Sequence, residues 1–277
     1  MARKLPCSLH RLYEASVQYV ESDLDFIQRV YRRKNGRLPY RLREDFCGTA
    51  LLACEWVKRS TKNSAVGVDL HAPTIRWAKQ CNVDRLTGSQ KERISLVEGD
   101  VLEVEVPGVD VVLGLNFSFC VFKTRALLKR YFVSALNGLN AGGMLVLDIY
   151  GGGDSVVAKE DDSRLIPGFM TPEGEQVPEF EYRWEQCSFD AVSHSTRCAI
   201  HFDVPGFGVV DHAYTYDWRL WTLPEIQELL LEAGFKTASV YLHGFTDEGE
   251  SDGVFRRRVR YENEAAWIAY VVGERGA

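Results

Sequence analysis

The sequence predicts a doubly wound α/β fold: a Rossmann-like, mostly parallel sheet of seven strands with an N-terminal helical cap and an inserted antiparallel β element. Between residues 38 and 153, apolar runs alternate with segments of helical periodicity, which is typical of a parallel sheet covered on both faces. After residue 153, runs of alternating polarity predict antiparallel strands. From about residue 217, a helical segment and two more apolar runs predict the return of the chain to the first sheet.

Composition and charge limit the possible environments. The 277 residues are 45% hydrophobic and 26% charged, which is sufficient for a large core, and the net charge of -6 creates no overall attraction for nucleic acid or an anionic membrane. The seven cysteines include no C-x-x-C pair, so we expect them to be reduced. The N-terminus lacks an apolar signal core and no run is long enough to span a bilayer. We therefore expect a cytoplasmic protein, monomeric or homodimeric, with no nucleic-acid or membrane partner.

Residues 1–37 are expected to form the helical cap. Apolar positions from about Ser8 to Arg33 recur at helical spacing, with acidic residues between them, which predicts one or two amphipathic helices. Basic residues gather at the end of this segment, where they would interact favourably with a helix C-terminus.

Residues 38–153 are expected to form the Rossmann-like core. Strands are predicted at about 40–44, 64–69, 93–101, 109–118 and 142–152, and helices at about 49–60, 73–82 and 123–138.

Residues 154–216 are expected to form the inserted lid, and residues 217–277 to complete the core. A charged, Pro- and Gly-rich loop extends to about Pro178, followed by strands near 180–190, 195–204 and 209–221. Thr222 predicts the cap of a helix that ends at Gly234, and two apolar strands follow.

Polar residues follow four successive strands of the predicted core. Glu44 and Asp45 end the first, Asp69 the second, Asp100 the third and Asn116 the fourth. Ligands of doubly wound sheets bind at the carboxyl ends of the strands. A carboxylate after the second strand can accept the ribose hydroxyls of a nucleoside, one after the third can accept the exocyclic amine of adenine, and the first acid suits an ammonium group.

These residues resemble the class I S-adenosylmethionine (SAM) dependent methyltransferases, of the small-molecule type. The similar stretches are "EDFCGTA", "VGVDL", "EGDVLE", "DVVLGLNFS" and "LNAGGMLVLDIY", with "WRLWTLPEIQELLLEAGF" similar to the closing helix of the family. In the first stretch only Gly48 remains where the family has glycines, with Phe46 and Ala50 in the other two places. The cap and the insertion are loosely similar to the glycine and sarcosine N-methyltransferase branch.

The resemblance implies SAM as cofactor, with S-adenosylhomocysteine (SAH) as product. The residues expected to bind it are Glu44, Asp45, Cys47, Gly48, Thr49, Asp69, Leu70, Asp100, Val101, Leu115 and Asn116, with Tyr13 and Tyr19 closing over it.

The acceptor is expected to be a small carboxylated or zwitterionic molecule, with N-methylation favoured. "NFSF" replaces the N/D-P-P-Y/F/W signature of nucleic-acid base methylation. Arginine can recognise a carboxylate and aromatic rings can hold a cationic amine. The expected acceptor-binding residues are Tyr216, Trp218, Arg219, Arg256 and Arg258, and the expected catalytic residues are Asn116, Tyr150 and Arg219. The arginines from 256 onward could equally be a solvated strand edge.

The sequence motifs are also compatible with other functions. A methyltransferase acting on protein or RNA, or a SAM-binding regulatory module without turnover, fits the same motifs, whereas the missing glycines count against a dinucleotide dehydrogenase. No metal site is expected, because His71, His201, His212 and His243 have no mutual i, i+4 spacing.

Overall fold

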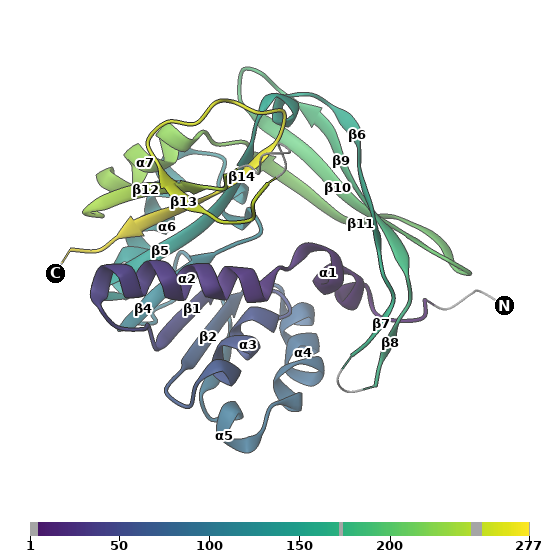
Figure 1. Ribbon diagram of the computed structural model, residues 1–277, viewed down its shortest axis with the longest axis horizontal. Coiled ribbons are helices and arrows are strands. Elements are labelled where there is room, and N and C mark those ends of the chain that lie inside the picture. Colours follow the sequence, from purple (N-terminus) through teal and green to yellow (C-terminus); the bar gives the residue numbers. More distant parts are fainter. Residues whose placement is uncertain (1–4, 172–173, 245–250, 277) are drawn as a thin grey trace. The chain divides into compact units, whose positions relative to one another are not determined.

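The computed structural model describes residues 5–171, 174–244 and 251–276, which form two compact units. Unit 1 comprises Met1–Gln18 and Gly152–Leu220, and unit 2 comprises Tyr19–Gly151 and Trp221–Ala277 (Figure 1). The segment expected as one cap, residues 1–37, is therefore divided between the units at Gln18.

Unit 2 contains a mostly parallel sheet, as predicted. Within the described residues it has eight strands in the order β13-β12-β14-β5-β4-β1-β2-β3. The strands are β1 (Arg41–Asp45), β2 (Ser64–Asp69), β3 (Ile94–Glu98), β4 (Val109–Gly114), β5 (Leu139–Gly151), β12 (Thr237–Leu242), β13 (Arg256–Arg258) and β14 (Trp267–Glu274). The first five pair in parallel, and β14 is antiparallel to both β5 and β12. The short edge strand β13 is the addition to the seven expected strands.

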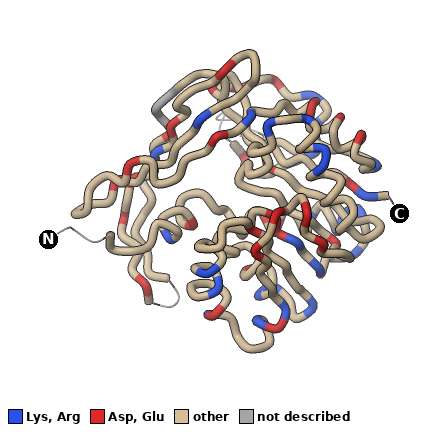
Figure 2. Tube along the Cα trace, turned by 180° about the vertical axis from the view of Figure 1, so that it is seen from behind, with Lys and Arg blue, Asp and Glu red and all other residues tan. Residues whose placement is uncertain are grey.

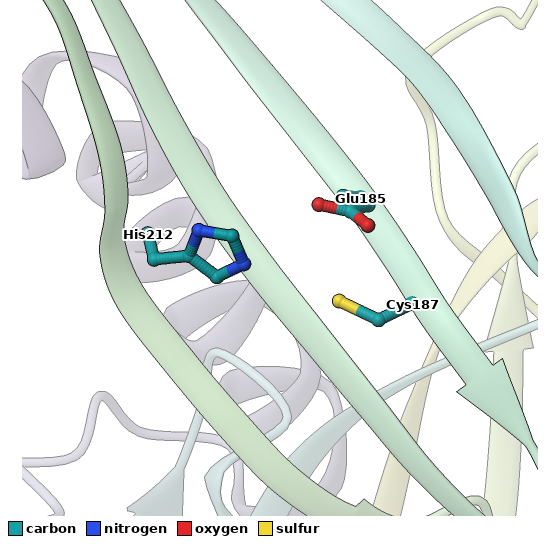
Figure 3. A group of neighbouring side chains, drawn as sticks. All are labelled: Glu185, Cys187 and His212. Atoms are coloured by element: carbon teal, nitrogen blue, oxygen red, sulfur yellow. The ribbon is translucent and has the colours of Figure 1, made fainter.

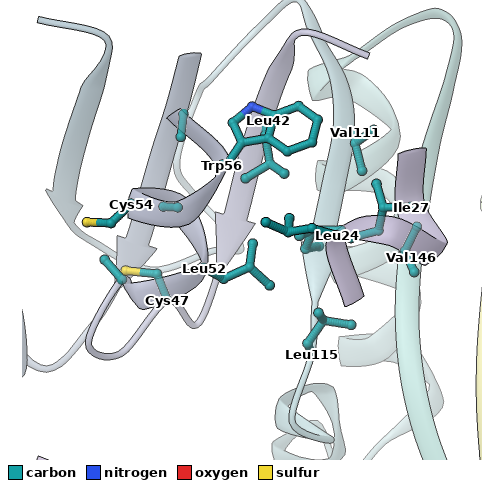
Figure 4. Packing of buried hydrophobic residues seen from close by; sticks show 14 of the residues in the cluster. Leu24, Ile27, Leu42, Cys47, Leu52, Cys54, Trp56, Val111, Leu115 and Val146 are labelled. Carbon is teal, nitrogen blue, oxygen red and sulfur yellow. The ribbon is translucent and has the colours of Figure 1, made fainter. Parts of the chain in front are cut away.

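Helices cover both faces of this sheet. They are α2 (Val20–Asn35), α3 (Leu51–Arg59), α4 (Ala72–Cys81), α5 (Gly88–Lys91), α6 (Arg125–Gly138) and α7 (Leu223–Glu232), with short 3-10 helices at Val83–Arg85 and Ser118–Val121. On one face, Leu24 of α2 and Trp56 of α3 pack with Leu42, Val111 and Val146 of the sheet (Figure 4). These side chains are almost fully buried, and each contributes about 1.5–3 kcal/mol by leaving water. This core fixes the strand ends that carry the candidate site.

Unit 1 is a helix packed on an antiparallel sheet. Its elements are α1 (Leu9–Val17), a 3-10 helix (Gly153–Val156), β6 (Lys159–Ile166), β7 (Phe169–Met170), β8 (Gln176–Val177), β9 (Phe180–Phe189), β10 (Ser195–Val204) and β11 (Gly208–Arg219). The main sheet has the order β11-β10-β9-β6, and β7 pairs with β8. Ser8 caps α1, and Leu12 of this helix joins Phe180 and Phe202 in the core.

Strand β6 corrects the expectation of a loop that extends to Pro178. Its sequence "KEDDSRLI" is too charged to predict a strand, yet it pairs antiparallel with β9 from Lys159 to Ile166. Neighbouring strands can override weak local propensity, and charge is common on an edge strand.

None of the helices in the described residues combines the length and the apolar character that a membrane crossing requires.

Candidate active site

The candidate site lies where the strand order of unit 2 reverses. β1 pairs with β2 on one side and with β4 on the other, so the loops after β1 and β4 diverge at the carboxyl ends of these strands. In open α/β sheets this crevice is the usual ligand site.

The loop after β1 keeps the backbone of a glycine-rich turn although two of its glycines are replaced. Phe46, Gly48 and Ala50 have φ values of 56°, 51° and 55°, all in the left-handed region. A non-glycine residue held there costs on the order of 1 kcal/mol or more. The ring of Phe46 packs 5.6 Å from Tyr131 and 6.0 Å from Phe122, between ring centroids, and Ala50 is fully buried. Packing thus holds a conformation that glycine would adopt readily.

Gly48 is the residue of this loop whose Cα borders unoccupied space. A Cβ atom added there would find only the Phe46 carbonyl oxygen, at 4.0 Å. The Gly48 amide donates a hydrogen bond to Asp69 (2.8 Å), which ties the loop to the end of β2. Bare backbone therefore faces open space beside a carboxylate.

The structure distinguishes the two adjacent acids of β1. Asp45 accepts a hydrogen bond from the Arg43 guanidinium (2.6 Å), and both side chains are fully buried. Glu44 instead accepts from the Ala53 amide at the start of α3 (3.0 Å) and lies close enough to Asp69 and Asp23 to be repelled by them. Asp45 is therefore committed to an internal ion pair, whereas Glu44 has no cationic partner among the described residues.

Three carboxyl groups of unit 2, the buried Glu44 and the partly buried Asp23 and Asp148, have no lysine or arginine partner among the described residues. Burial, with repulsion between the acids, raises the pKa of Glu44 to about 8 and that of Asp148 to about 7. Burial also raises the pKa of Asp23 to about 6, although Tyr270 donates a hydrogen bond to it. No lysine or arginine in the described parts of the chain forms an ion pair with any of the three. Such a cluster favours a cationic ligand.

Asp69 is the last residue of β2, and Asp100 lies in the loop that follows β3, as predicted. Asp69 is half-buried and also accepts a hydrogen bond from the His71 amide (2.8 Å), and the exposed Asp100 accepts one from the Leu102 amide (2.9 Å). Leu70 is 72% exposed directly after Asp69. An exposed apolar side chain directly after a strand-end carboxylate would suit a flat ring with polar edges.

The loop after β4 is held by Asp148 of β5. Asn116 and Phe117 both have positive φ, and their amides donate to the two oxygens of Asp148 at 2.9 and 2.8 Å. The ring of Tyr150 lies 4.9 Å from that of Phe117. Asn116 and Tyr150, both predicted catalytic residues, therefore belong to one loop and strand pair.

Several predicted cofactor residues face the protein interior. Cys47, Thr49, Val101 and Leu115 are buried, and burial raises the pKa of the Cys47 thiol well above its usual value. The Cys47 amide donates to the Val68 carbonyl (2.9 Å). These residues shape the loops, and their side chains pack inside the protein.

The remaining predicted residues divide between the units. Tyr19, before α2, belongs to unit 2 and is 60% exposed. Tyr13, Tyr216, Trp218 and Arg219 belong to unit 1. There, Tyr216 lies 4.3 Å from Trp218 between ring centroids, and Tyr13 lies 4.9 Å from Tyr214. The predicted aromatic face of β11 therefore exists, with Tyr13 of α1 beside it.

Arg256 and Arg258 differ although both lie on β13. Arg256 forms an ion pair with Asp252 (2.5 Å), whereas the buried Arg258 Nε has no hydrogen-bond partner among the described residues. Within the described residues, a carboxylate therefore engages the guanidinium of Arg256 and not that of Arg258.

The sequence analysis does not single out Asp23 or Asp148. Asp148 could have been found, because it is the one charged residue in the apolar run "MLVLDIY". Nothing in the sequence distinguishes Asp23, because an acid on an amphipathic helix is ordinarily solvated.

Comparisons with known proteins agree on the fold. No family model matches the sequence, and no curated protein matches it. Among solved structures, a SAM-dependent methyltransferase from Clostridium acetobutylicum is 16% identical with a TM-score of 0.64, covering 97% of this chain and 98% of that one. A sugar N-methyltransferase from Streptoalloteichus is 16% identical with a TM-score of 0.64, covering 100% of this chain and 96% of the other. A SAM-bound amino pentose methyltransferase from Micromonospora echinaspora is 15% identical with a TM-score of 0.63, covering 98% and 99%. The chain has the Rossmann-like fold of these proteins.

Proposed function

We propose that the protein is a SAM-dependent methyltransferase that methylates a small-molecule amine. The observation that carries the proposal is the group of Asp23, Glu44 and Asp148, which are partly or fully buried. The group has no counter-ion in the described residues and adjoins the glycine-type loop of residues 46–50. SAM carries a sulfonium and an ammonium group, so it offers the positive charge that these carboxyl groups lack.

The residues present fit SAM at four places. Glu44 would bind the ammonium group, Gly48 would let the backbone approach the methionine part, Asp69 would accept the ribose hydroxyls and Asp100 the adenine amine. The support is the open space above Gly48 and the positions of the acids at successive strand ends. SAM, when bound, supplies an electrophilic methyl group.

The chain's own contribution to methyl transfer would be positioning. Displacement at a sulfonium requires the nucleophile to be close and aligned, which is where most of the rate enhancement arises. Asn116 would orient the acceptor by its amide, because Asp148 fixes the backbone of this loop through two hydrogen bonds. Tyr150, packed on Phe117, would form one wall of the acceptor site.

An amine acceptor with a carboxylate or another anionic group is the preferred substrate class. Two similar structures are described as a sugar N-methyltransferase and an amino pentose methyltransferase, which supports an amine nitrogen. Arg258, with an unpartnered Nε in the described chain, is the proposed anion-binding residue of unit 2. For Tyr216, Trp218 and Arg219 of unit 1, acceptor binding stays a prediction from the sequence.

The first test is thermal unfolding of the purified protein with SAM, SAH, NAD or buffer. A ligand that binds only the native state raises its stability, by about 2.7 kcal/mol at a hundredfold excess over Kd. We expect SAM and SAH to raise Tm by several degrees and NAD to leave it unchanged. Absence of a shift with both sulfur compounds would overturn the proposal.

Turnover separates an enzyme from a regulatory SAM-binding module. Amino sugars, amino acids and other carboxylated amines are incubated with SAM and the protein, and SAH is measured by mass spectrometry. Acceptor-dependent SAH formation supports the enzyme, whereas binding without SAH formation across amines, thiols and phenols would favour the module.

A further inference from the structure

A β-bulge in unit 1 brings two histidines together. Ile200 of β10 pairs with Tyr214 of β11, but Phe202 pairs with Val210, so three residues of β11 lie opposite the single residue His201. The central one, His212, has a φ of 49°. Because of this bulge, Asp211 and His212 both turn toward His201, and the rings of the two histidines lie 4.9 Å apart between centroids.

His201 is held between two carboxylates. Its Nδ1 lies 2.5 Å from Asp211 Oδ1 and its Nε2 lies 3.0 Å from Glu185 Oε2. The ring is almost fully buried, on the side of β10 opposite to the core residues Ile200 and Phe202. A histidine that binds a metal through one nitrogen usually donates the other N–H to a carboxylate. Glu185 is in the right place for that second role.

His212 completes the group. Its Nδ1 lies 2.8 Å from the second oxygen of Asp211. The ligand atoms of His201, Asp211 and His212 all lie within 4.8 Å of one another. Figure 3 shows the His212 ring pointing across β10 toward Glu185 and Cys187, which form a second group with it at the same spacing.

No fixed positive charge balances this group in the described residues. Glu185 and Asp211 have histidines as their only ion-pair partners there. Arg183 pairs with His201 in the strand register and Arg197 pairs with Ser188, but neither arginine forms an ion pair with the two carboxylates among the described residues.

We propose that this face of the unit 1 sheet binds a divalent transition metal such as Zn²⁺ through His201, Asp211 and His212, with Glu185 orienting His201. Imidazole and carboxylate are the ligands of zinc sites that keep one position open, and Zn–N and Zn–O bonds of about 2.0–2.2 Å need only small side-chain rotations from the present spacing. Proton sharing among the same side chains is the alternative that the test must separate. The proposal does not depend on methyl transfer, since metal binding is measured without SAM.

The test uses the full-length protein after treatment with a chelator, titrated with Zn²⁺ in a calorimeter. We expect saturable binding of one ion per chain, weakened about a hundredfold by His212→Asn or Asp211→Asn. Glu185→Gln should weaken binding roughly tenfold, as expected for a residue that orients a ligand. Asparagine at position 212 suits the left-handed backbone.

His194→Asn is the matched control. His194 also has a positive φ, 57°, in the turn between β9 and β10, but it belongs to neither metal-binding group. It should bind Zn²⁺ as the wild type does. Circular dichroism of each metal-free variant checks the fold. No saturable binding, or binding that His212→Asn leaves unchanged, would overturn the site.

Cobalt distinguishes the histidine site from simple binding to a thiol. Four-coordinate Co²⁺ gives intense visible absorption that must disappear in His212→Asn. A sulfur charge-transfer band that is lost in both Cys187→Ser and His212→Asn supports the site and adds Cys187 as the fourth ligand. The spectrum of aqueous Co²⁺, or a band that depends on Cys187 alone, would contradict the proposal.

Discussion

At Glu44, the buried carboxyl couples stability and ligand binding to pH. Its pKa of about 8 means that the folded state binds a proton more tightly than the unfolded state, in which glutamate has a pKa near 4.3. The sign follows directly: the stabilisation is complete below the unfolded pKa and is lost as the pH rises through about 8. A cationic ligand favours the ionised form, so SAM affinity should increase over the upper part of the same range.

Glu44→Gln should separate these two effects. We expect the variant to be more stable than the wild type at about pH 9, by on the order of 1 kcal/mol, because it has no buried charge. The difference should shrink toward pH 5. Its SAM affinity should be lower and should lose the part of the pH dependence that lies near pH 8, while Asp148 and Asp23 still titrate at lower pH. Urea unfolding and calorimetric titration at several pH values measure both, and a wild-type pH slope in the variant would contradict the assignment.

Asp69→Ala should weaken SAM binding about 30- to 100-fold, since hydrogen bonds to a charged group contribute about 1.5–3 kcal/mol each. The variant also loses the hydrogen bonds from the Gly48 and His71 amides, so circular dichroism must confirm its fold. Asp84→Ala is the control, because Asp84 is an exposed acid whose partner is Lys91 at 3.7 Å. Unchanged SAM affinity in a folded Asp69→Ala protein would exclude the ribose role.

The left-handed loop predicts different effects on stability and SAM affinity for substitutions at Ala50 and Gly48. Ala50→Gly should change the free energy of unfolding by less than about 1 kcal/mol, because relief of the positive φ offsets a lost buried methyl group. Gly48→Ala should cost about 1 kcal/mol of stability but reduce SAM affinity by far more, because the new methyl group enters the open space. Thermal unfolding measures the stability of both variants, and calorimetric titration measures their SAM affinity. If Gly48→Ala bound SAM as tightly as the wild type, the ligand would not approach the backbone at Gly48.

At the scale of elements, hydrogen bonds link the loop after β4 to the end of β5. A single carboxylate on β5 holds two successive left-handed residues after β4. Asp148→Ala removes both hydrogen bonds and should cost about 2 kcal/mol, or roughly 4–8 °C in Tm for a chain of this size. Asp148→Asn, which keeps one acceptor, should lie between that variant and the wild type. A Tm of Asp148→Ala equal to the wild type would show that packing alone holds the loop.

The same elements show what the sequence can and cannot predict. Buried parallel strands read as apolar runs, so β1 to β5 and the acids at their ends were predictable. β6 was not, because its pairing partner β9 and not its own composition makes it a strand. The left-handed backbone of the loop at Phe46 and Ala50 is held by side-chain packing. The number of glycines in the sequence gives no information about such packing. His201 and His212 meet through a bulge in the register, so helical spacing carried no information about them.

At the scale of the whole molecule, the two units should respond to different ligands. Acidic and basic residues are spread along the chain in both units (Figure 2). The net charge of -6 nevertheless falls on unit 1, which has 14 acidic and 8 basic residues, whereas unit 2 has 25 of each. Hydrogen exchange should slow at residues 46–50, 69–71 and 115–117 with SAM, and at 199–203 and 210–213 with Zn²⁺. Protection is measured by mass spectrometry with each ligand alone. Protection by SAM confined to unit 1 would contradict the placement of its site in unit 2.

The discontinuity of unit 1 also affects its synthesis. Leu12 of α1 shares a core with Phe180 and Phe202, which leave the ribosome only after β1 to β5 have been made. At a translation rate of about 5–20 residues per second, α1 waits roughly 8–35 seconds for its packing partners. During that time its apolar face is exposed on the nascent chain. A chaperone that acts during translation would therefore find an apolar binding site in residues 9–17 throughout this interval.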